Sequence, residues 1–98
     1  MPAILRRSPL AGTGVQQTPH TVGLTWTASV STDVVGYNIY RGSVSGGPYS
    51  ILDAAPVASD AYSDSTVQSG QTYFYVVRSV DNTGTESANS SQVQAVIP

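Results

Sequence analysis

The sequence predicts an all-β chain that folds as an antiparallel β-sandwich of about seven strands. Its 98 residues provide enough chain for one small domain. Apolar and polar residues alternate with a period of two along several short segments, a pattern typical of strands with one buried face. Turn residues separate these segments about every 8 to 12 residues, which is the spacing of a sandwich. No segment combines a helical apolar period with helix caps.

The first regular strand is expected from Thr21 onward. Val22, Leu24 and Trp26 alternate there with small or polar residues, so this segment predicts one buried face and one exposed face. A polar break at 29–33 ends the strand.

A second strand is expected after this break. Val35, Tyr37 and Ile39 are predicted to share one face, because alternate residues of a strand point to the same side. Asn38 and Tyr40 are then predicted to point to the opposite side.

The next segments are short and are interrupted by turn residues. The turn at 42–48 contains Gly46-Gly47-Pro48, its sharpest signal. A small edge strand is expected over Tyr49–Leu52, and Pro56 prevents its continuation because proline lacks an amide hydrogen. Another short strand is expected over Ala61–Ser65.

The longest strand signal runs over Thr72–Asp81. Both of its alternating faces are fairly apolar, so we expect a central strand that is partly covered on both sides. A loop built on Asn82-Thr83-Gly84 follows it. The last strand places Val93, Ala95 and Ile97 inward.

The inward faces of these strands predict one core between two sheets. Its predicted members are Val22, Leu24, Trp26, Tyr37, Ile39, Tyr73, Tyr75, Val77, Val93, Ala95 and Ile97. The structural centre of this core is expected at Trp26, Tyr37, Ile39, Tyr73 and Val77.

Composition excludes several classes of partner. Only 10% of the residues are charged and the net charge is −2, which argues against a nucleic-acid partner. No apolar run approaches the roughly 18 residues of a membrane span, so no membrane insertion is expected. The absence of cysteine excludes a disulfide framework and a cysteine-based zinc site.

Three stretches of the sequence also resemble a known family. Thr25-Trp26-Thr27-Ala28-Ser29, Gly36-Tyr37-Asn38-Ile39-Tyr40-Arg41 and Gly70-Gln71-Thr72-Tyr73 resemble a fibronectin type III domain, in the variant common in bacterial secreted and surface proteins. The resemblance covers residues 20–98 and implies an immunoglobulin-like sandwich. It also implies that Tyr73 forms a tyrosine corner, with its hydroxyl bonded to the main chain near Val67–Gly70.

Residues 1–19 depart from the family pattern and form an N-terminal arm. Within it, the string from Leu10 to Val15 resembles the closing strand of hydin-type immunoglobulin-like domains. The arm is expected to be either the first strand of its own sandwich or a strand that pairs with a neighbouring copy or domain. In the second case Leu5, Leu10 and Val15 are candidate partner contacts.

The resemblance implies a protein that is secreted or located at the cell surface. The first seven residues contain two arginines but no apolar stretch after them, so they do not form a signal peptide. We therefore expect the chain to be a mature piece or a fragment of a longer protein.

The sequence offers little catalytic chemistry. His20 is the only histidine and is expected to be a solvated turn residue. Asp60 and Asp64 are close enough to share a face as paired carboxylates, but acidic residues beside short strands are normally solvated. We expect no enzyme activity, no catalytic residue, no metal site and no cofactor.

Two surface features are candidates for binding. Tyr40, Tyr49 and Tyr62 remain outside the predicted core and offer rings on which a polysaccharide could stack, with Tyr40 and Tyr49 as the candidate contacts. The loop at Asn82 and Thr83 is a candidate contact for a protein, although its residues are also those that form turns.

Three functions remain open from the sequence. The first is a non-catalytic extracellular or cell-surface structural or adhesion module, which would join its own copies into a fibre through the arm. The alternative is a spacer or carbohydrate-contacting module of a secreted polysaccharide-degrading enzyme. The third is a protein-binding domain that uses its loops.

Overall fold

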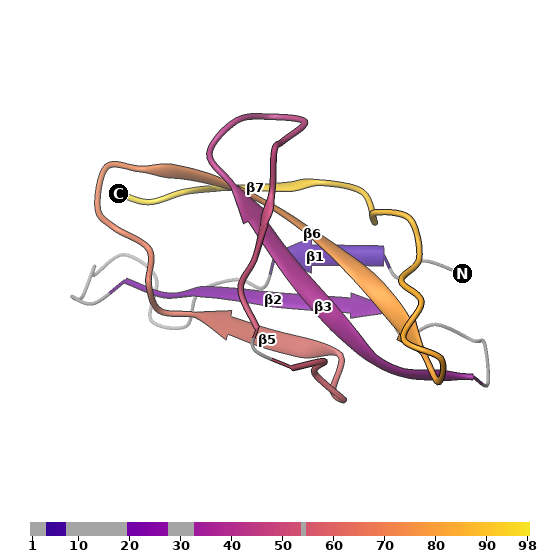
Figure 1. Ribbon diagram of the computed structural model, residues 1–98. Coiled ribbons are helices and arrows are strands. Elements are labelled where there is room, and N and C mark those ends of the chain that lie inside the picture. The colour runs from indigo at the N-terminus through magenta and orange to yellow at the C-terminus, as the bar shows by residue number, and fades with distance from the viewer. Residues whose placement is uncertain (1–3, 8–19, 28–32, 54) are drawn as a thin grey trace.

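The computed structural model describes residues 4–7, 20–27, 33–53 and 55–98 (Figure 1). Of the predicted features, Leu10, Val15 and the break at 29–32 lie outside the described residues. Leu5 is placed by the backbone pairing of its strand.

Among the described residues, seven strands form two antiparallel sheets that pack as a sandwich (Figure 1). The three-stranded sheet has the order β1 (Ile4–Arg7), β2 (Val22–Thr27), β5 (Ala61–Asp64). The four-stranded sheet has the order β4 (Ser50–Ile51), β3 (Val34–Gly42), β6 (Thr72–Asp81), β7 (Val93–Val96). The predicted all-β sandwich is confirmed.

The core lies between the two sheets. Trp26 is only 3% exposed, and its ring meets the ring of Tyr37 edge to face at 5.4 Å between centroids. Such an aromatic contact adds to the free energy gained by burying the two rings. The buried members of the core are Val22, Leu24, Trp26, Tyr37, Ile39, Val67, Tyr75, Val77, Ala95 and Ile97. Tyr73 and Val93 are half-buried at its border.

Strand β6 is the strand covered on both faces. It has the bounds that the sequence predicts and lies between β3 and β7. Tyr75 and Val77 are buried in the core, while Val76 and Val80 point to the other side. These two outward valines are nevertheless buried, at 2% and 5% exposure.

The prediction that Val35 faces inward with Tyr37 and Ile39 is wrong. The pairing of β3 with β6 shifts register between Val34 and Gly36, so Val35 is the extra residue of a β-bulge. Val35 is 57% exposed, and Val34 packs against the core in its place. One inserted residue reverses the alternation before the bulge, because side chains alternate with a period of two.

Strand β1 forms the edge of the three-stranded sheet, beside β2. Leu5 lies opposite Trp26, and Arg7 lies opposite Leu24. For residues 4–7 the structure therefore favours the first of the two expected arrangements, in which the arm supplies a strand to its own sandwich.

The loop between β3 and β4 is tied to the segment that precedes β7. The backbone N–H of Gly46 donates to Gln92 Oε1 at 2.8 Å, and the Tyr49 hydroxyl donates to the same oxygen. Gly42 permits this close packing, because a Cβ at that position would lie 2.5 Å from the carbonyl oxygen of Pro48. The position of the loop thus depends on one glycine and one side-chain amide.

Candidate functional site

Glu86 is the centre of a hydrogen-bond network on the outer side of the four-stranded sheet. It accepts hydrogen bonds from the Tyr40 hydroxyl at 2.5 Å, Asn38 Nδ2 at 2.6 Å and Arg78 Nη1 at 3.1 Å. The hydrogen bond from Tyr40 is the largest cause that holds the pKa of Glu86 below its usual value, and those from Asn38 and Arg78 add to it. The Arg78 guanidinium lies 4.5 Å from the centroid of the Tyr40 ring and donates to Asn89 Oδ1 at 2.7 Å. The network joins β3, β6 and the segment after β6.

Asp81 organises the turn after β6. Its Oδ1 atom accepts hydrogen bonds from the backbone N–H groups of Thr83 and Thr85, both at 2.9 Å, and from Thr83 Oγ1 at 2.6 Å. The hydrogen bond from the Thr83 side chain is the first cause that lowers the pKa of Asp81. Asn82 and Thr83, the candidate contacts in this loop, are exposed. The Asp81 carboxylate therefore serves the turn itself.

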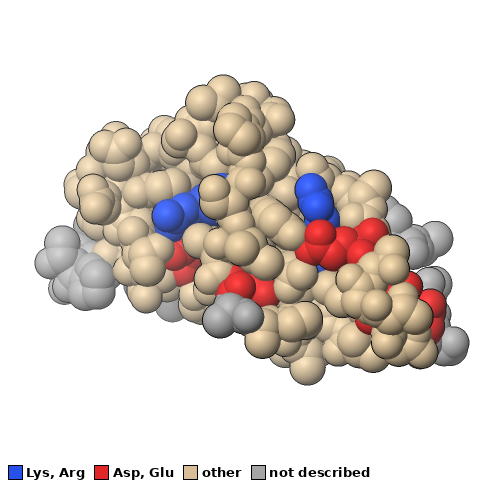
Figure 2. Space-filling view, viewed as in Figure 1, with Lys and Arg blue, Asp and Glu red and all other residues tan. Residues whose placement is uncertain are grey.

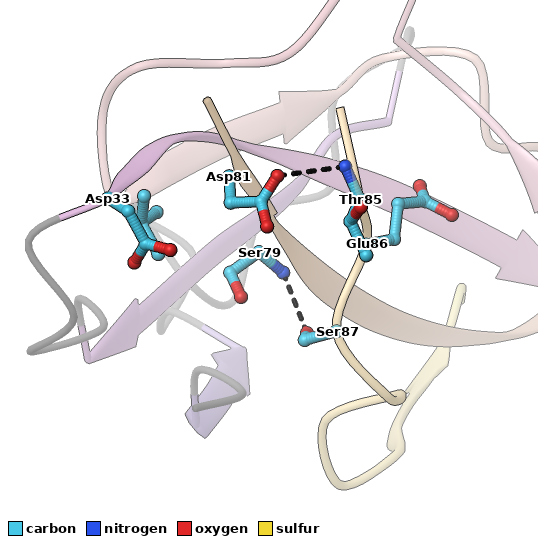
Figure 3. Close-up of a pocket in the computed structure, with 7 residues that line it drawn as sticks. Asp33, Ser79, Asp81, Thr85, Glu86 and Ser87 are labelled. Atoms are coloured by element: carbon cyan, nitrogen blue, oxygen red, sulfur yellow. Dashed lines mark hydrogen bonds between the residues drawn. The ribbon is translucent and has the colours of Figure 1, made fainter. Parts of the chain in front are cut away.

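A pocket of about 200 Å³ lies beside this turn (Figure 3). Asp33 lines one side and Asp81 and Glu86 line the other, while the N–H of Ser79 donates to Ser87 Oγ at 3.0 Å. The carboxylates of Asp81 and Glu86 are both engaged by the hydrogen bonds above. No group of three histidine, cysteine or acidic side chains within the described ranges is arranged to hold a metal ion.

A second network closes one side of the sandwich between β3 and β5. Arg41 Nη1 donates to Asp64 Oδ2 at 2.9 Å and to Thr66 Oγ1 at 2.8 Å. The Tyr75 hydroxyl donates to the same carboxylate oxygen at 2.7 Å. Burial alone would raise the pKa of Asp64, but the hydrogen bonds from Thr66, Tyr75 and Arg41 outweigh it and leave that pKa below its usual value.

The expectation of solvated carboxylates is wrong for Asp64. Asp60 is exposed, but Asp64 is only 3% exposed. Asp64 lies directly opposite Val22 in the β2–β5 ladder, and residues opposite each other point to the same side of a sheet. Because Val22 faces the core, Asp64 does as well.

The expectation of a solvated His20 is also wrong. His20 is only 9% exposed. It stands two residues before Val22 and so continues the inward alternation of Val22, Leu24 and Trp26. The sequence contained this signal, since His20 has the spacing of the buried face.

The three remaining tyrosines do not form one platform. Tyr62 belongs to the three-stranded sheet and packs against the core. Tyr40 and Tyr49 belong to the other sheet region, where their hydroxyls bond to Glu86 and Gln92. One face of the Tyr40 ring is covered by a guanidinium, so that face is not available for stacking on a sugar.

The bond that the family resemblance implies for Tyr73 is present. The backbone N–H of Gln68 donates to the Tyr73 hydroxyl at 3.0 Å. The guanidinium of Arg41 lies 4.9 Å from the centroid of the same ring. Tyr73 thus connects the start of β6 both to the preceding turn and to β3.

A cleft of about 430 Å³ opens beside this tyrosine. Arg41 and Tyr73 line it together with Ser50 and Ile51 of β4. Sequence reasoning did not find this cleft, because Arg41 and β4 come together there only through the β3–β4 pairing.

Two of the described arginines are each paired with a carboxylate. Figure 2 shows blue beside red at two places on an otherwise largely tan face. The two ion pairs among the described residues are Arg41 with Asp64 and Arg78 with Glu86. Sequence reasoning missed both pairs, since their members lie 23 and 8 residues apart. Arg41 meets Asp64 between the two sheets, and Arg78 meets Glu86 where the segment after β6 folds back onto that strand. In the part of the chain that the structure describes, no helix is long and apolar enough to span a membrane.

Comparisons with known proteins identify the family. No family model matches the sequence. The crystal structure of an Fn3-like protein from Clostridium thermocellum is 36% identical, with a TM-score of 0.71, and the match covers 86% of this chain and 83% of that one. The chain belongs to the fibronectin type III family. The pectate lyase PelI of Erwinia chrysanthemi, 21% identical with a TM-score of 0.73, contains the same fold in a match that covers 97% of this chain and 28% of that one.

Sequence relatives place such fibronectin type III segments within much longer proteins. The chain is 46% identical over 74 residues to an amylopullulanase of Thermoanaerobacter thermohydrosulfuricus, a match that covers 76% of this chain. It is 42% identical over 69 residues to the amylopullulanase of Thermoanaerobacterium saccharolyticum, and this match covers 70% of this chain. In both cases the chain spans about 5% of the relative's length.

Proposed function

We propose that this fibronectin type III domain is a non-catalytic accessory module of a secreted polysaccharide-degrading enzyme, in which it acts as a spacer between neighbouring domains. The similarity to a segment that makes up 5% of an amylopullulanase supports this proposal. A segment of that size leaves the catalytic chemistry to the rest of such an enzyme.

The observation that carries the spacer role is the placement of the start of β1 and of the C-terminus at opposite ends of the sandwich. β1 begins at the right of the sandwich and the C-terminus lies at the left (Figure 1). The longest dimension of the molecule is 42 Å. A folded module that is entered at one end and left at the other holds its neighbours at a set separation, whereas a flexible linker of the same length does not.

Two of the described carboxylates support a non-catalytic role, because they are occupied within the fold. The carboxylate of Asp64 accepts hydrogen bonds from Arg41 and Tyr75, and that of Glu86 is held by Tyr40 and Arg78. A general base needs a carboxylate within reach of a substrate proton, and these two are already engaged.

The test exchanges the matching segment of the Thermoanaerobacter thermohydrosulfuricus amylopullulanase for this chain. A matched control carries a flexible Gly/Ser segment of the same length. We expect the exchanged enzyme to hydrolyse pullulan with the heat resistance of the parent enzyme, and the Gly/Ser control to inactivate at a lower temperature, because only a folded spacer fixes the neighbouring domains. Residual activity after heating is the measurement.

Two results would overturn the proposal. One is a Gly/Ser control that resists heat as well as the exchanged enzyme does. The other is release of reducing sugar from pullulan by the isolated 98-residue chain.

A further inference from the structure

The cleft beside Tyr73 has the size of a ligand site and lies at the edge strand β4. Its volume of about 430 Å³ falls within the range of about 300 to 1,000 Å³ that is usual for small-ligand pockets. Ser50 and Ile51 of β4 stand at its edge, and both are exposed. The cleft is therefore open to a ligand from solvent.

Arg41 brings unused hydrogen-bond donors to this cleft. Its hydrogen bonds to Asp64 and Thr66 both leave from Nη1. Nε and Nη2 have no hydrogen-bond partner among the described residues, so three of the five N–H groups of the guanidinium remain. The guanidinium lies 4.9 Å from the centroid of the Tyr73 ring, and this contact holds it beside the cleft.

The charge of Arg41 is already compensated. Asp64 lies 2.9 Å from Nη1, and the side chain of Asp64 is only 2% exposed. An anion at the cleft would meet this buried carboxylate as well as the guanidinium, so it would gain little from charge. Neutral hydroxyl oxygens can accept hydrogen bonds from the remaining N–H groups without repulsion from the Asp64 carboxylate.

The remaining walls suit the apolar faces of a sugar ring. Leu52 and Tyr73 are half-buried and line the cleft, while the side chain of Ile51 points to the opposite face of the sheet, because Ile51 lies opposite Tyr40. Ser43 and Ser50 are exposed at the cleft and supply hydroxyl groups. Apolar surface with a few converging polar groups is the usual composition of a small-ligand site.

We infer that this cleft binds a short stretch of a neutral glucan. The Arg41 guanidinium donates to sugar hydroxyls while Leu52 and Tyr73 contact the ring carbons. This inference rests on the proposed function, since an accessory module that contacts the substrate would hold its enzyme at the polysaccharide. Binding at so open a cleft is expected to be weak, with a dissociation constant on the order of 1 mM.

The test is a titration of the labelled chain with maltotriose, followed by NMR. We expect the backbone amide signals of Ser43, Ser50 and Ile51 to shift together, and those of Asn82 and Thr83 to stay in place. Trigalacturonate is the anionic counterpart and is expected to bind more weakly, because of the carboxylate of Asp64. Absence of shifts at the cleft, or tighter binding of trigalacturonate, would overturn the inference.

Two variants separate binding from folding. Ser50→Trp places a large ring at the mouth of the cleft and is expected to weaken binding at least about tenfold. Its matched control, Ser63→Trp, changes another exposed strand serine that does not line the cleft, and it should bind as the parent chain does. Equal binding by both variants would also overturn the inference.

Arg41→Lys provides a second measurement. It keeps the positive charge beside Asp64 but removes the planar fork of donors, so binding should weaken while the thermal unfolding curve remains cooperative. Unchanged binding by a folded Arg41→Lys chain contradicts the assigned role of Arg41. If the parent chain itself does not bind maltotriose and the exchanged amylopullulanase still resists heat, the cleft is rejected and the spacer role stands.

Discussion

At the scale of single residues, Asp64 shows how a buried charge is accommodated in a small sandwich. Its carboxylate accepts four hydrogen bonds, from Arg41 Nη1, the Tyr75 hydroxyl, and the backbone N–H and Oγ1 of Thr66. The pKa of Tyr75 is raised by burial first and by its hydrogen bond to Asp64 second. The ionised carboxylate and the neutral phenol are therefore the forms that the fold stabilises.

We expect Asp64→Asn to lower the free energy of unfolding at pH 7 by about 3 kcal/mol, because it leaves the guanidinium of Arg41 without its anion. The folded state holds the pKa of Asp64 below the unfolded value of about 3.9, so ionised Asp64 stabilises the fold above that pH. This contribution is lost as the pH falls through the folded pKa. The difference between the parent chain and the variant should therefore shrink between pH 7 and pH 3 in urea unfolding curves.

The exposed Asp60 supplies the control for this prediction. Asp60→Asn should change stability by no more than about 0.5 kcal/mol at either pH. A difference between parent and Asp64→Asn that stays constant from pH 7 to pH 3 would show that ionisation of Asp64 does not stabilise the fold.

At the scale of elements, the loop between β3 and β4 depends on close backbone packing at Gly42. A Cβ there would lie 2.5 Å from the Pro48 carbonyl oxygen and 3.1 Å from Tyr49 Cδ1. Gly42→Ala should therefore displace the loop and lower the free energy of unfolding by about 1–3 kcal/mol. Hydrogen exchange at the Gly46 amide, which is bonded to Gln92, should become faster in the same variant.

The neighbouring exposed Ser43 offers a matched substitution in the same loop. Ser43→Ala adds no atom near the Pro48 carbonyl and should leave both stability and Gly46 exchange close to those of the parent chain. If Gly42→Ala changes the free energy of unfolding and the Gly46 exchange rate as little as Ser43→Ala does, the close packing of this loop is contradicted.

At the scale of the whole molecule, the N-terminal arm can pair within its own sandwich or with another copy, and the edge of the three-stranded sheet shows the first arrangement. β1 pairs with β2 in the same chain, with Leu5 opposite Trp26. Deletion of Met1–Arg7 should therefore expose the edge of β2, lower the urea midpoint and increase association, because unpaired strand edges recruit other chains. Light scattering at several concentrations measures this association.

The alternative view of the arm makes the opposite prediction. If residues 1–7 joined separate copies into a fibre, their deletion would abolish association instead of promoting it. A parent chain that associates and a shortened chain that does not would contradict the pairing of β1 within its own sheet. Exposed Val96→Ser is a control, since it leaves β1 in place.

The strand pattern of the sequence was sufficient for most of the fold. Val22, Leu24 and Trp26 face the core as their alternation predicts, and β6 has the predicted bounds. These predictions succeed because burial of one face imposes a period of two on the residues that form it. His20 obeys the same period, so its burial was also present in the sequence.

The candidate site was less accessible to sequence reasoning. The cleft and the network at Glu86 join residues from β3, β4, β6 and the following turn. Their members share no sequence motif, because their proximity follows from strand order and register. Arg41 illustrates this, since its ion pair and hydrogen bond require Asp64, which lies 23 residues further along the chain.

The sequence by itself determined the class of fold, most of the inward faces of the strands and the family, because these follow from local alternation and from short motifs around Trp26, Tyr37 and Tyr73. Only the tertiary structure decided the bulge at Val35, the ion pair of Arg41 with the buried Asp64, and the pairing of β1. The physical reason is that the free energy of contacts across the sheets sets register and pairing. The alternation of residues along one strand does not specify which residue of another strand will lie opposite.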